Sequence, residues 1–172
     1  MKLSAGNVTR MVASYSYDDI GRLISLKRSG NVGMVNYAYN IRNWLNETKS
    51  DRFSQNLWYE TTGAYPCFNG NISRLQWQSG KDHVLRGYDF AYDGLNRLEE
   101  STYAEGAGMS QSKSHYSEHV LSYSPNGSIE RLQRYGKKNN GTFCLIDDLT
   151  YAYNGNQIKS ISDKAGSLLY DG

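Results

Sequence analysis

Aromatic and apolar residues alternate with polar ones over short stretches of the chain, as at Tyr15 and Tyr17 and again at Leu149, Tyr151 and Tyr153. Residues two positions apart lie on the same face of a β-strand, so this alternation predicts strands. Gly and Asn interrupt the alternation at short intervals, which leaves little room for a helix. The pattern therefore predicts an all-β chain.

A short motif recurs six times along the chain. It combines aromatic or apolar residues two positions apart, an Asp, Asn or Ser, a turn, and an aliphatic residue. Four copies occupy residues 15–23, 37–45, 90–98 and 121–129, and two shorter versions occupy residues 68–72 and 151–158. Tandem repetition of this kind predicts a fold built by stacking one supersecondary unit.

The copy at residues 15–23 predicts a β-hairpin. Tyr15 and Tyr17 share one face of the outgoing strand, and Leu23 follows on the returning strand. Asp18 opens the turn, where its carboxylate can accept hydrogen bonds from turn amides. Gly21 closes the turn, because a loop of four residues requires a left-handed backbone there.

The position of Gly21 is taken by Asn43, Asn96 and Gly127 in three other copies. Asn is among the non-glycine residues that best tolerate positive φ, so these substitutions respect one backbone constraint. We predict positive φ at all four positions. The residues to which we assign a structural role in the repeat, the signature residues, are Tyr15, Tyr17, Asp18, Gly21, Leu23, Tyr37, Tyr39, Asn40, Asn43, Tyr92, Asp93, Asn96, Leu98, Tyr123, Gly127, Tyr151, Tyr153 and Asn154.

The motif resembles the signature of the Rhs/YD-repeat family, Tyr-x-Tyr-Asp-x-x-Gly-Arg-Leu, which residues 15–23 match at every fixed position. The resemblance extends over residues 14–172, and the segments at 39–45, 68–73 and 92–98 look similar to a long-chain bacterial branch of that family. It implies a spiralling β-sheet that closes as a hollow shell, as in toxin-complex shells and teneurins. In bacterial members the shell encloses a variable C-terminal toxin, and the parent protein is secreted or displayed on the cell surface.

The chain differs from a complete family member, because it has no plug domain, no C-terminal core with self-cleaving aspartates and no toxin. We therefore expect one domain, residues 1–172, of about six hairpin units that is truncated at both ends. The expected fold is an open, strongly twisted antiparallel sheet that forms an arc or partial spiral. Its expected partners are the remaining repeats of the parent chain, an enclosed toxin polypeptide and other copies of the fragment.

Two further expectations concern the C-terminal half. Tyr170-Asp171-Gly172 repeats the start of a turn, and the apolar strand Leu168-Leu169-Tyr170 is the expected docking strand for self-association. The Gly- and Ser-rich stretch at residues 105–117 lacks a period and is expected to be a long surface loop.

Charge and cysteine content exclude some classes of function. The 19 Lys and Arg residues and the 17 Asp and Glu residues are scattered, with a net charge of +2, so no basic stripe indicates nucleic-acid binding. No stretch is long and apolar enough for a membrane span, and the first residues lack the apolar core of a signal peptide. Cys67 and Cys144 lie far apart and outside any metal or redox motif, while their pairing stays open.

Motifs for catalysis are weak. His115, Glu118 and His119 match the H-x-x-E-H pattern of zinc peptidases, but that site needs a helix, and no apolar helical face accompanies it. Doublets such as Asp147-Asp148 resemble the carboxylate pair of a glycosidase, but neighbours on a strand point to opposite faces. We therefore predict no catalytic residue, no metal and no cofactor, and expect a structural protein rather than an enzyme.

The aromatic residues support one alternative. Trp44, Trp58 and Trp77, with the repeat tyrosines, are candidates for a face that binds a glycan or a polypeptide. The competing interpretation, which we favour, is that the rings stack across strands and stabilise a thin sheet. An adhesion module is thus the second functional hypothesis, and a zinc-dependent or acid/base hydrolase is a distant third.

Overall fold

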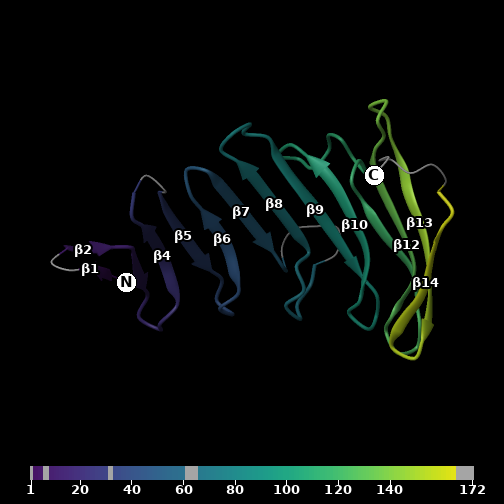
Figure 1. Ribbon diagram of the computed structural model, residues 1–172, viewed down its shortest axis with the longest axis horizontal. Helices are drawn as coiled ribbons and strands as arrows, with labels where there is room; N and C mark the ends of the chain where they lie inside the picture. The colour runs from purple at the N-terminus through teal and green to yellow at the C-terminus, as the bar shows by residue number, and fades with distance from the viewer. Residues whose placement is uncertain (1, 6–7, 31–32, 61–65, 166–172) are drawn as a thin grey trace. The chain divides into compact units, whose positions relative to one another are not determined.

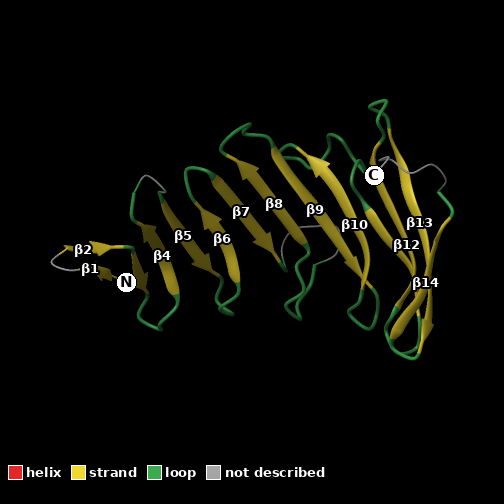
Figure 2. Cartoon of the chain, viewed as in Figure 1, coloured by secondary structure: helices red, strands yellow, loops and turns green. Residues whose placement is uncertain are grey.

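The computed structural model of the chain describes residues 2–5, 8–30, 33–60 and 66–165 (Figure 1). Within these residues, every regular element is a β-strand and no helix occurs (Figure 2). The all-β prediction is therefore confirmed. None of the described residues belongs to a helix long and apolar enough to cross a membrane.

The described strands form two sheets. A small antiparallel sheet contains β1 (Lys2–Ala5) and β2 (Val8–Met11). The large sheet has 12 strands. In chain order these are β3 (Ala13–Tyr17), β4 (Leu23–Arg28), β5 (Met34–Tyr39), β6 (Leu45–Lys49), β7 (Phe53–Trp58), β8 (Arg74–Ser79), β9 (Leu85–Tyr92), β10 (Leu98–Glu105), β11 (Glu118–Tyr123), β12 (Ile129–Lys137), β13 (Phe143–Asn154) and β14 (Gln157–Asp163).

The large sheet is an open antiparallel meander. Each strand lies beside its neighbour in the sequence, from β3 at one edge to β14 at the other. Repeat turns join β3 to β4, β5 to β6, β9 to β10, β11 to β12 and β13 to β14. The predicted open sheet of consecutive hairpins is thus confirmed, and the shortened copy at 68–72 instead precedes β8 as a loop.

The chain divides into two compact units. The N-terminal unit comprises Met1–Trp58 and Leu75–Leu85, and the C-terminal unit comprises Tyr59–Arg74 and Arg86–Gly172. All three tryptophans belong to the N-terminal unit.

The backbone prediction for the repeat turns is confirmed. Asn43 and Asn96 have φ of 64° and 65°, and Gly21 and Gly127 each have φ of 85°. A β-branched residue is strongly disfavoured in this region, whereas Gly and Asn tolerate it. The shared position in the sequence therefore reflects one shared turn geometry.

The core of the C-terminal unit contains part of the segment that was expected to be a surface loop. Residues 105–117 do connect β10 to β11 as a loop, but they do not lie simply on the surface. Met109 is only 4% exposed and Ser117 is fully buried. The fully buried Ser117 hydroxyl accepts the backbone N–H of Tyr103 at 2.9 Å, and Tyr103 itself is 3% exposed. The loop folds back against β10 because its short polar side chains satisfy buried backbone groups.

A carboxylate fixes the start of the same loop. The Glu105 side chain accepts hydrogen bonds from the Tyr103 hydroxyl at 2.7 Å and the Ser112 hydroxyl at 2.8 Å. These bonds hold the pKa of Glu105 below its ordinary value, while burial and the adjacent carboxylate raise the pKa of Tyr103. Aromatic rings complete the packing, because the ring centroid of Tyr103 lies 5.4 Å from that of Tyr88 and 5.2 Å from that of Tyr116.

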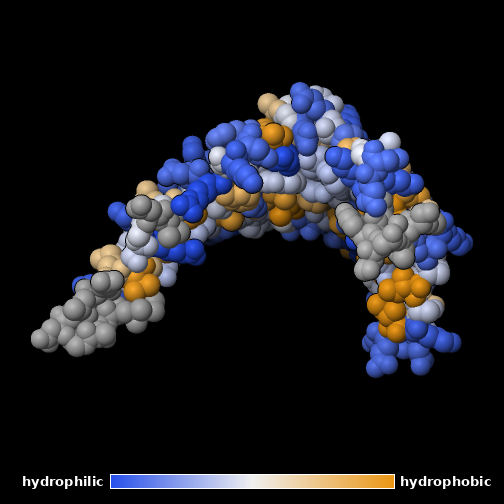
Figure 3. Space-filling view, turned by 45° about the horizontal axis from the view of Figure 1, so that its top comes forward, coloured by the Kyte–Doolittle hydropathy of each residue, from blue (hydrophilic) through white to orange (hydrophobic). Residues whose placement is uncertain are grey.

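No disulfide joins Cys67 and Cys144, which are both half-buried. The expected docking strand Leu168-Leu169-Tyr170 and the turn that begins at Tyr170 lie outside the described residues. In the face drawn in Figure 3, hydrophobic residues occur in small groups between hydrophilic ones. A sheet with so few buried apolar side chains depends on contacts between neighbouring hairpins.

Candidate functional site

Each full hairpin turn is organised by the side chain that opens it. The Asp18 carboxylate accepts the backbone N–H groups of Ile20 at 3.1 Å and Arg22 at 2.8 Å. Its second oxygen accepts Nε of Arg22 at 2.6 Å. The backbone closes the loop, because the Gly21 N–H donates to the Asp18 carbonyl at 3.0 Å. One carboxylate thus satisfies two turn amides and positions one guanidinium.

The same arrangement recurs at Asp93 in the C-terminal unit. Its carboxylate accepts the N–H groups of Leu95 and Arg97, both at 2.9 Å, and Nε of Arg97 at 2.6 Å. Backbone and side-chain hydrogen bonds from Arg97 hold the pKa of Asp93 below its ordinary value, against a smaller opposing effect of desolvation. At Asp18 desolvation is the largest single influence and raises the pKa, but the hydrogen bonds from Arg22 and Ile20 together outweigh it. Both carboxylates are therefore occupied by their own turns.

Asn and Ser perform the turn-opening role without a charge. Asn40 accepts the N–H groups of Arg42 at 2.9 Å and Trp44 at 3.0 Å. Ser124 accepts the N–H of Ser128 at 3.1 Å. The backbone role of the position is therefore retained when the carboxylate is absent.

Consecutive hairpins are joined by tyrosine hydroxyls. Among the described residues, four tyrosines donate to a backbone carbonyl of the preceding repeat copy: Tyr39 to Leu23 at 3.0 Å, Tyr92 to Ile72 at 2.9 Å, Tyr123 to Leu98 at 2.5 Å and Tyr153 to Ile129 at 2.6 Å. In every case the donor is the residue immediately before the Asp, Asn or Ser of its own copy. We call this tyrosine-to-carbonyl contact the repeat junction.

The strand register explains which carbonyl accepts. Leu23 is paired with Tyr17 within its hairpin, Leu98 with Tyr92, and Ile129 with Tyr123. The acceptor is therefore the residue that is paired, within its own hairpin, with the tyrosine at the junction position of the motif. This rule applies to each of these three junctions.

The junction forms where pairing between neighbouring hairpins has ended. Pairing of β4 with β5 ends at Ser25, pairing of β10 with β11 ends at Glu100, and pairing of β12 with β13 ends at Arg131. Each of these residues lies two positions beyond the acceptor carbonyl. The tyrosine hydroxyl thus donates to a carbonyl near the turn, beyond the last residue that pairs with the neighbouring hairpin.

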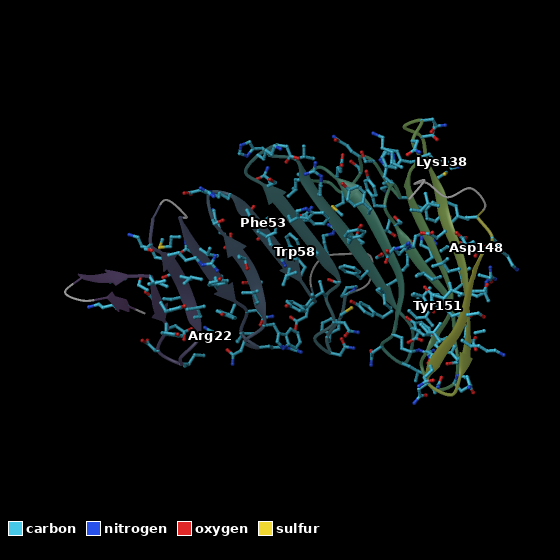
Figure 4. The ribbon with its side chains drawn as sticks, in the orientation of Figure 1. Arg22, Phe53, Trp58, Lys138, Asp148 and Tyr151 are labelled. Carbon is cyan, nitrogen blue, oxygen red and sulfur yellow. The ribbon has the colours of Figure 1, made fainter. Side chains whose placement is uncertain are left out.

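Arginine completes two of the junctions. The guanidinium carbon of Arg22 lies 5.0 Å from the ring centroid of Tyr39, and that of Arg97 lies 4.4 Å from the ring centroid of Tyr123. Each arginine is the one held by its turn aspartate, so the carboxylate presents a cation to the ring of the next hairpin. Arg22, labelled at the turn between β3 and β4 in Figure 4, also donates to Oδ1 of Asn43 at 2.8 Å.

The signature residues therefore have distinct positions. Tyr39, Tyr92, Tyr123 and Tyr153 form junctions, whereas Tyr37 and Tyr151 are half-buried at the other aromatic position of their strands. Tyr15 and Tyr17 on β3 are 46% and 58% exposed. Asn154 precedes a turn of two residues, in which Gly155 has φ of 60°. Phe68 occupies the junction position of its copy but has no hydroxyl to donate.

The tryptophans of the proposed aromatic face are not freely exposed. Trp44, Trp58 and Trp77 are each half-buried. Arg42 covers Trp44, with its guanidinium carbon 5.2 Å from the ring centroid. Figure 4 places Trp58 at the end of β7.

The H-x-x-E-H residues occupy different environments. The ring of His115 lies in the loop before β11 and stacks on Phe143, with centroids 3.6 Å apart and planes at 5°. His119, on β11, lies 3.6 Å from a carboxylate oxygen of Glu100. Over the described ranges, no group of three or more His, Cys, Asp or Glu residues is arranged to hold a metal ion.

The carboxylate doublet on β13 is paired with arginines of β12. Asp147 lies 2.7 Å from Arg134, and Asp148 lies 3.2 Å from Arg131. These cross-strand pairs resemble the half-buried pair of Arg74 with Asp89, whose closest atoms are 2.5 Å apart. The carboxylates thus connect strands rather than face each other across an open site.

Two parts of this site were not predicted from the sequence. Arg22 and Arg97 were not assigned a role, although each follows its turn aspartate by four residues, a spacing that signals an ion pair across the turn. The acceptor carbonyls carry no signal in the side-chain sequence. Their identity follows only from the hairpin register.

The motif of residues 15–23 is the basis for the family resemblance, and the repeat junction gives its residues physical roles. No protein-family model matches the chain, and no curated protein matches it.

Proposed function

We propose that this chain is a non-enzymatic structural segment of the wall of a larger Rhs-type protein that is secreted or displayed at the cell surface and encloses a toxin. The observation that carries the proposal is the repeat junction, which recurs four times among the described residues. A junction that every new hairpin can repeat suits a wall that extends by addition of one unit at a time.

The use of polar side chains supports a structural role. The carboxylates of Asp18 and Asp93 are bound by their own turns, and Asp147 and Asp148 pair with arginines of the neighbouring strand. A catalytic acid or base needs access to a substrate, and each of these groups already has a partner inside the framework. Their charge stabilises turns and strand pairs.

The partners of such a wall are the remaining repeats of the parent chain and the enclosed polypeptide. The hairpin turns also present apolar side chains to solvent, because Ile41 is 97% exposed and Leu95 is 72% exposed. These side chains are available for contact with further repeats of the parent.

The reading frame that surrounds the gene segment provides the first test. We expect it to encode further Tyr-x-Tyr-Asp repeats and, beyond them, a core and a variable C-terminal polypeptide. A flanking frame without repeats would contradict the proposal.

The second test uses the parent protein and limited proteolysis. Replacing Tyr39, Tyr123 and Tyr153 with Phe should expose the enclosed polypeptide to protease at a lower urea concentration than in the unmodified parent. The matched control replaces Tyr15, Tyr37 and Tyr151, which occupy the other aromatic position. Equal sensitivity of both triple variants would contradict a wall held by repeat junctions.

A carbohydrate- or protein-binding adhesion module is the second candidate. The observation that favours it is the exposure of Tyr15 and Tyr17 on the same strand, since such rings can stack on sugars. Binding on a glycan array that is lost in Tyr15→Ala, Trp44→Ala or Trp77→Ala would favour this role. Absence of binding by the unmodified chain would leave the wall as the better account.

A further inference from the structure

The two edge strands of the large sheet carry complementary halves of the repeat junction. At one edge, Tyr17 on β3 occupies the donor position, immediately before Asp18 and opposite Leu23. At the other edge, Ile158 on β14 is paired with Tyr153 and so occupies the acceptor position. Within the part of the chain that the structure describes, neither edge has a further strand beside it.

We propose that a second copy of this chain binds at this edge, with β3 of one molecule antiparallel to β14 of another and the Tyr17 hydroxyl donating to the Ile158 carbonyl. The occupant is inferred from the molecule itself, because four internal junctions show which strand follows a return strand. The inference rests on the junction geometry and concerns residues 1–172 as a separate molecule, because the neighbouring repeats of a longer parent would occupy the same two edges.

The side chains at the two edges suit this contact. Tyr17 is 58% exposed, whereas its counterpart Tyr39, which is engaged in a junction, is half-buried. Ile158 and Ile161 on β14 are 56% and 53% exposed. Aromatic and β-branched residues on an unpaired strand favour pairing with another strand.

Charge does not oppose the pairing. The strand β3 contains no ionisable group except its tyrosines, and β14 contains one cation, Lys159, and one anion, Asp163. Like charges facing each other across a new strand pair would be destabilising, and none is present.

The contact joins different surfaces of the two molecules. Each copy offers one donor edge and one acceptor edge, so association is head to tail and continues beyond the dimer unless a ring closes. We therefore expect the average mass of the full chain in solution to rise continuously with protein concentration.

Sedimentation velocity on residues 1–172 measures this association. Tyr17→Phe keeps the ring and removes only the hydroxyl, and we expect it to weaken association about five-fold, the effect of one hydrogen bond. The matched control is Tyr37→Phe. Tyr37 lies on the inner strand β5, at the motif position that Tyr15 occupies in its own copy, so loss of its hydroxyl should leave association unchanged. Trp fluorescence of each variant verifies that the N-terminal unit is folded.

A mixing experiment tests the head-to-tail geometry. Tyr17→Glu places a negative charge on the donor edge, and Ile161→Glu places a negative charge on the acceptor edge, so each variant alone should be monomeric, and the two altered edges repel each other. An equimolar mixture retains one intact pair of edges and should form a one-to-one heterodimer and nothing larger.

Several outcomes would overturn the proposal: an unmodified chain that stays monomeric at all concentrations, association that Tyr17→Phe does not weaken, or a mixture that forms no heterodimer. Association that persists in either charged variant alone would indicate a different surface, such as a sheet face. None of these results depends on the flanking reading frame or on proteolysis of the parent. Failure of this inference is therefore distinguishable from failure of the wall function.

Discussion

Removal of a single hydroxyl at Tyr39 tests the repeat junction in the N-terminal unit. In Tyr39→Phe the ring stays in place beside Arg22, and only the hydrogen bond of 3.0 Å to the Leu23 carbonyl is lost. That carbonyl lies outside the pairing of β4 with β5, which ends at Ser25. The substitution thus leaves one acceptor without this partner and changes little else.

The expected loss follows from the energetics of hydrogen bonds. A net contribution of about 1 kcal/mol is typical of an intramolecular hydrogen bond in a partly buried position. For a small unit with a urea dependence of about 1–2 kcal/mol per molar, this corresponds to a midpoint lower by roughly 0.5–1 M urea.

Trp fluorescence during urea denaturation is a suitable assay, because all three tryptophans lie in the same unit as Tyr39. Tyr37→Phe is the matched control, since this tyrosine lies two residues earlier on β5 and forms no repeat junction. We expect the control to change stability by less than about 0.5 kcal/mol. Equal midpoints for Tyr39→Phe and Tyr37→Phe would refute the claim that the hydroxyl joins the two hairpins.

Three further substitutions test other contacts. Gly80→Ala should destabilise the N-terminal unit by about 2 kcal/mol, because the new Cβ would lie 2.5 Å from the Asp51 carbonyl oxygen, whereas Gly94→Ala meets open space and should cost less than about 0.5 kcal/mol by thermal denaturation. Ser117→Ala should cost about 1–3 kcal/mol in thermal denaturation, since it leaves the buried N–H of Tyr103 without its acceptor. Because the pKa of Asp93 is lowered on folding, its stabilising effect is present above about pH 4 and is lost as the pH falls through the folded-state value, so Asp93→Asn should reduce the acid-induced loss of stability measured by circular dichroism.

The turn geometry could be predicted from the sequence because it depends on local chemistry. Gly21 and Asn43 occupy one backbone conformation that few residue types tolerate, so the residue type itself carries the signal. The strand alternation around Tyr15 and Tyr17 is equally local. These features predicted an open sheet of consecutive hairpins without any long-range information.

The repeat junction could not be predicted in this way. The Tyr123 hydroxyl reaches the carbonyl of Leu98, 25 residues earlier, and a backbone carbonyl has no identity in the sequence. Its position depends on the register of two hairpins. The motif marked the four junction tyrosines as signature residues, but it gave Tyr37 and Tyr151, at the other aromatic position, the same role.

The segment at residues 105–117 is a loop as predicted, but the expectation that it lies on the surface was wrong, for a different reason. Its Gly- and Ser-rich composition is typical of exposed linkers. However, Ser117 and Met109 are buried because the hydroxyl of Ser117 replaces a strand partner for Tyr103 and the loop returns over β10. Composition describes the average environment of a segment and does not show which hydroxyl satisfies a buried amide.

The exchange rates of the tyrosine hydroxyl protons, measured by NMR on a chain with isotope-labelled tyrosine, test the repeat junction most directly. The account predicts slow exchange for the four junction hydroxyls, Tyr39, Tyr92, Tyr123 and Tyr153, because each is hydrogen-bonded to a carbonyl of the preceding copy. Tyr15 and Tyr37, at the other aromatic position, should exchange rapidly in a monomeric sample. Rapid exchange at all six positions would contradict the claim that these hydroxyls join consecutive hairpins.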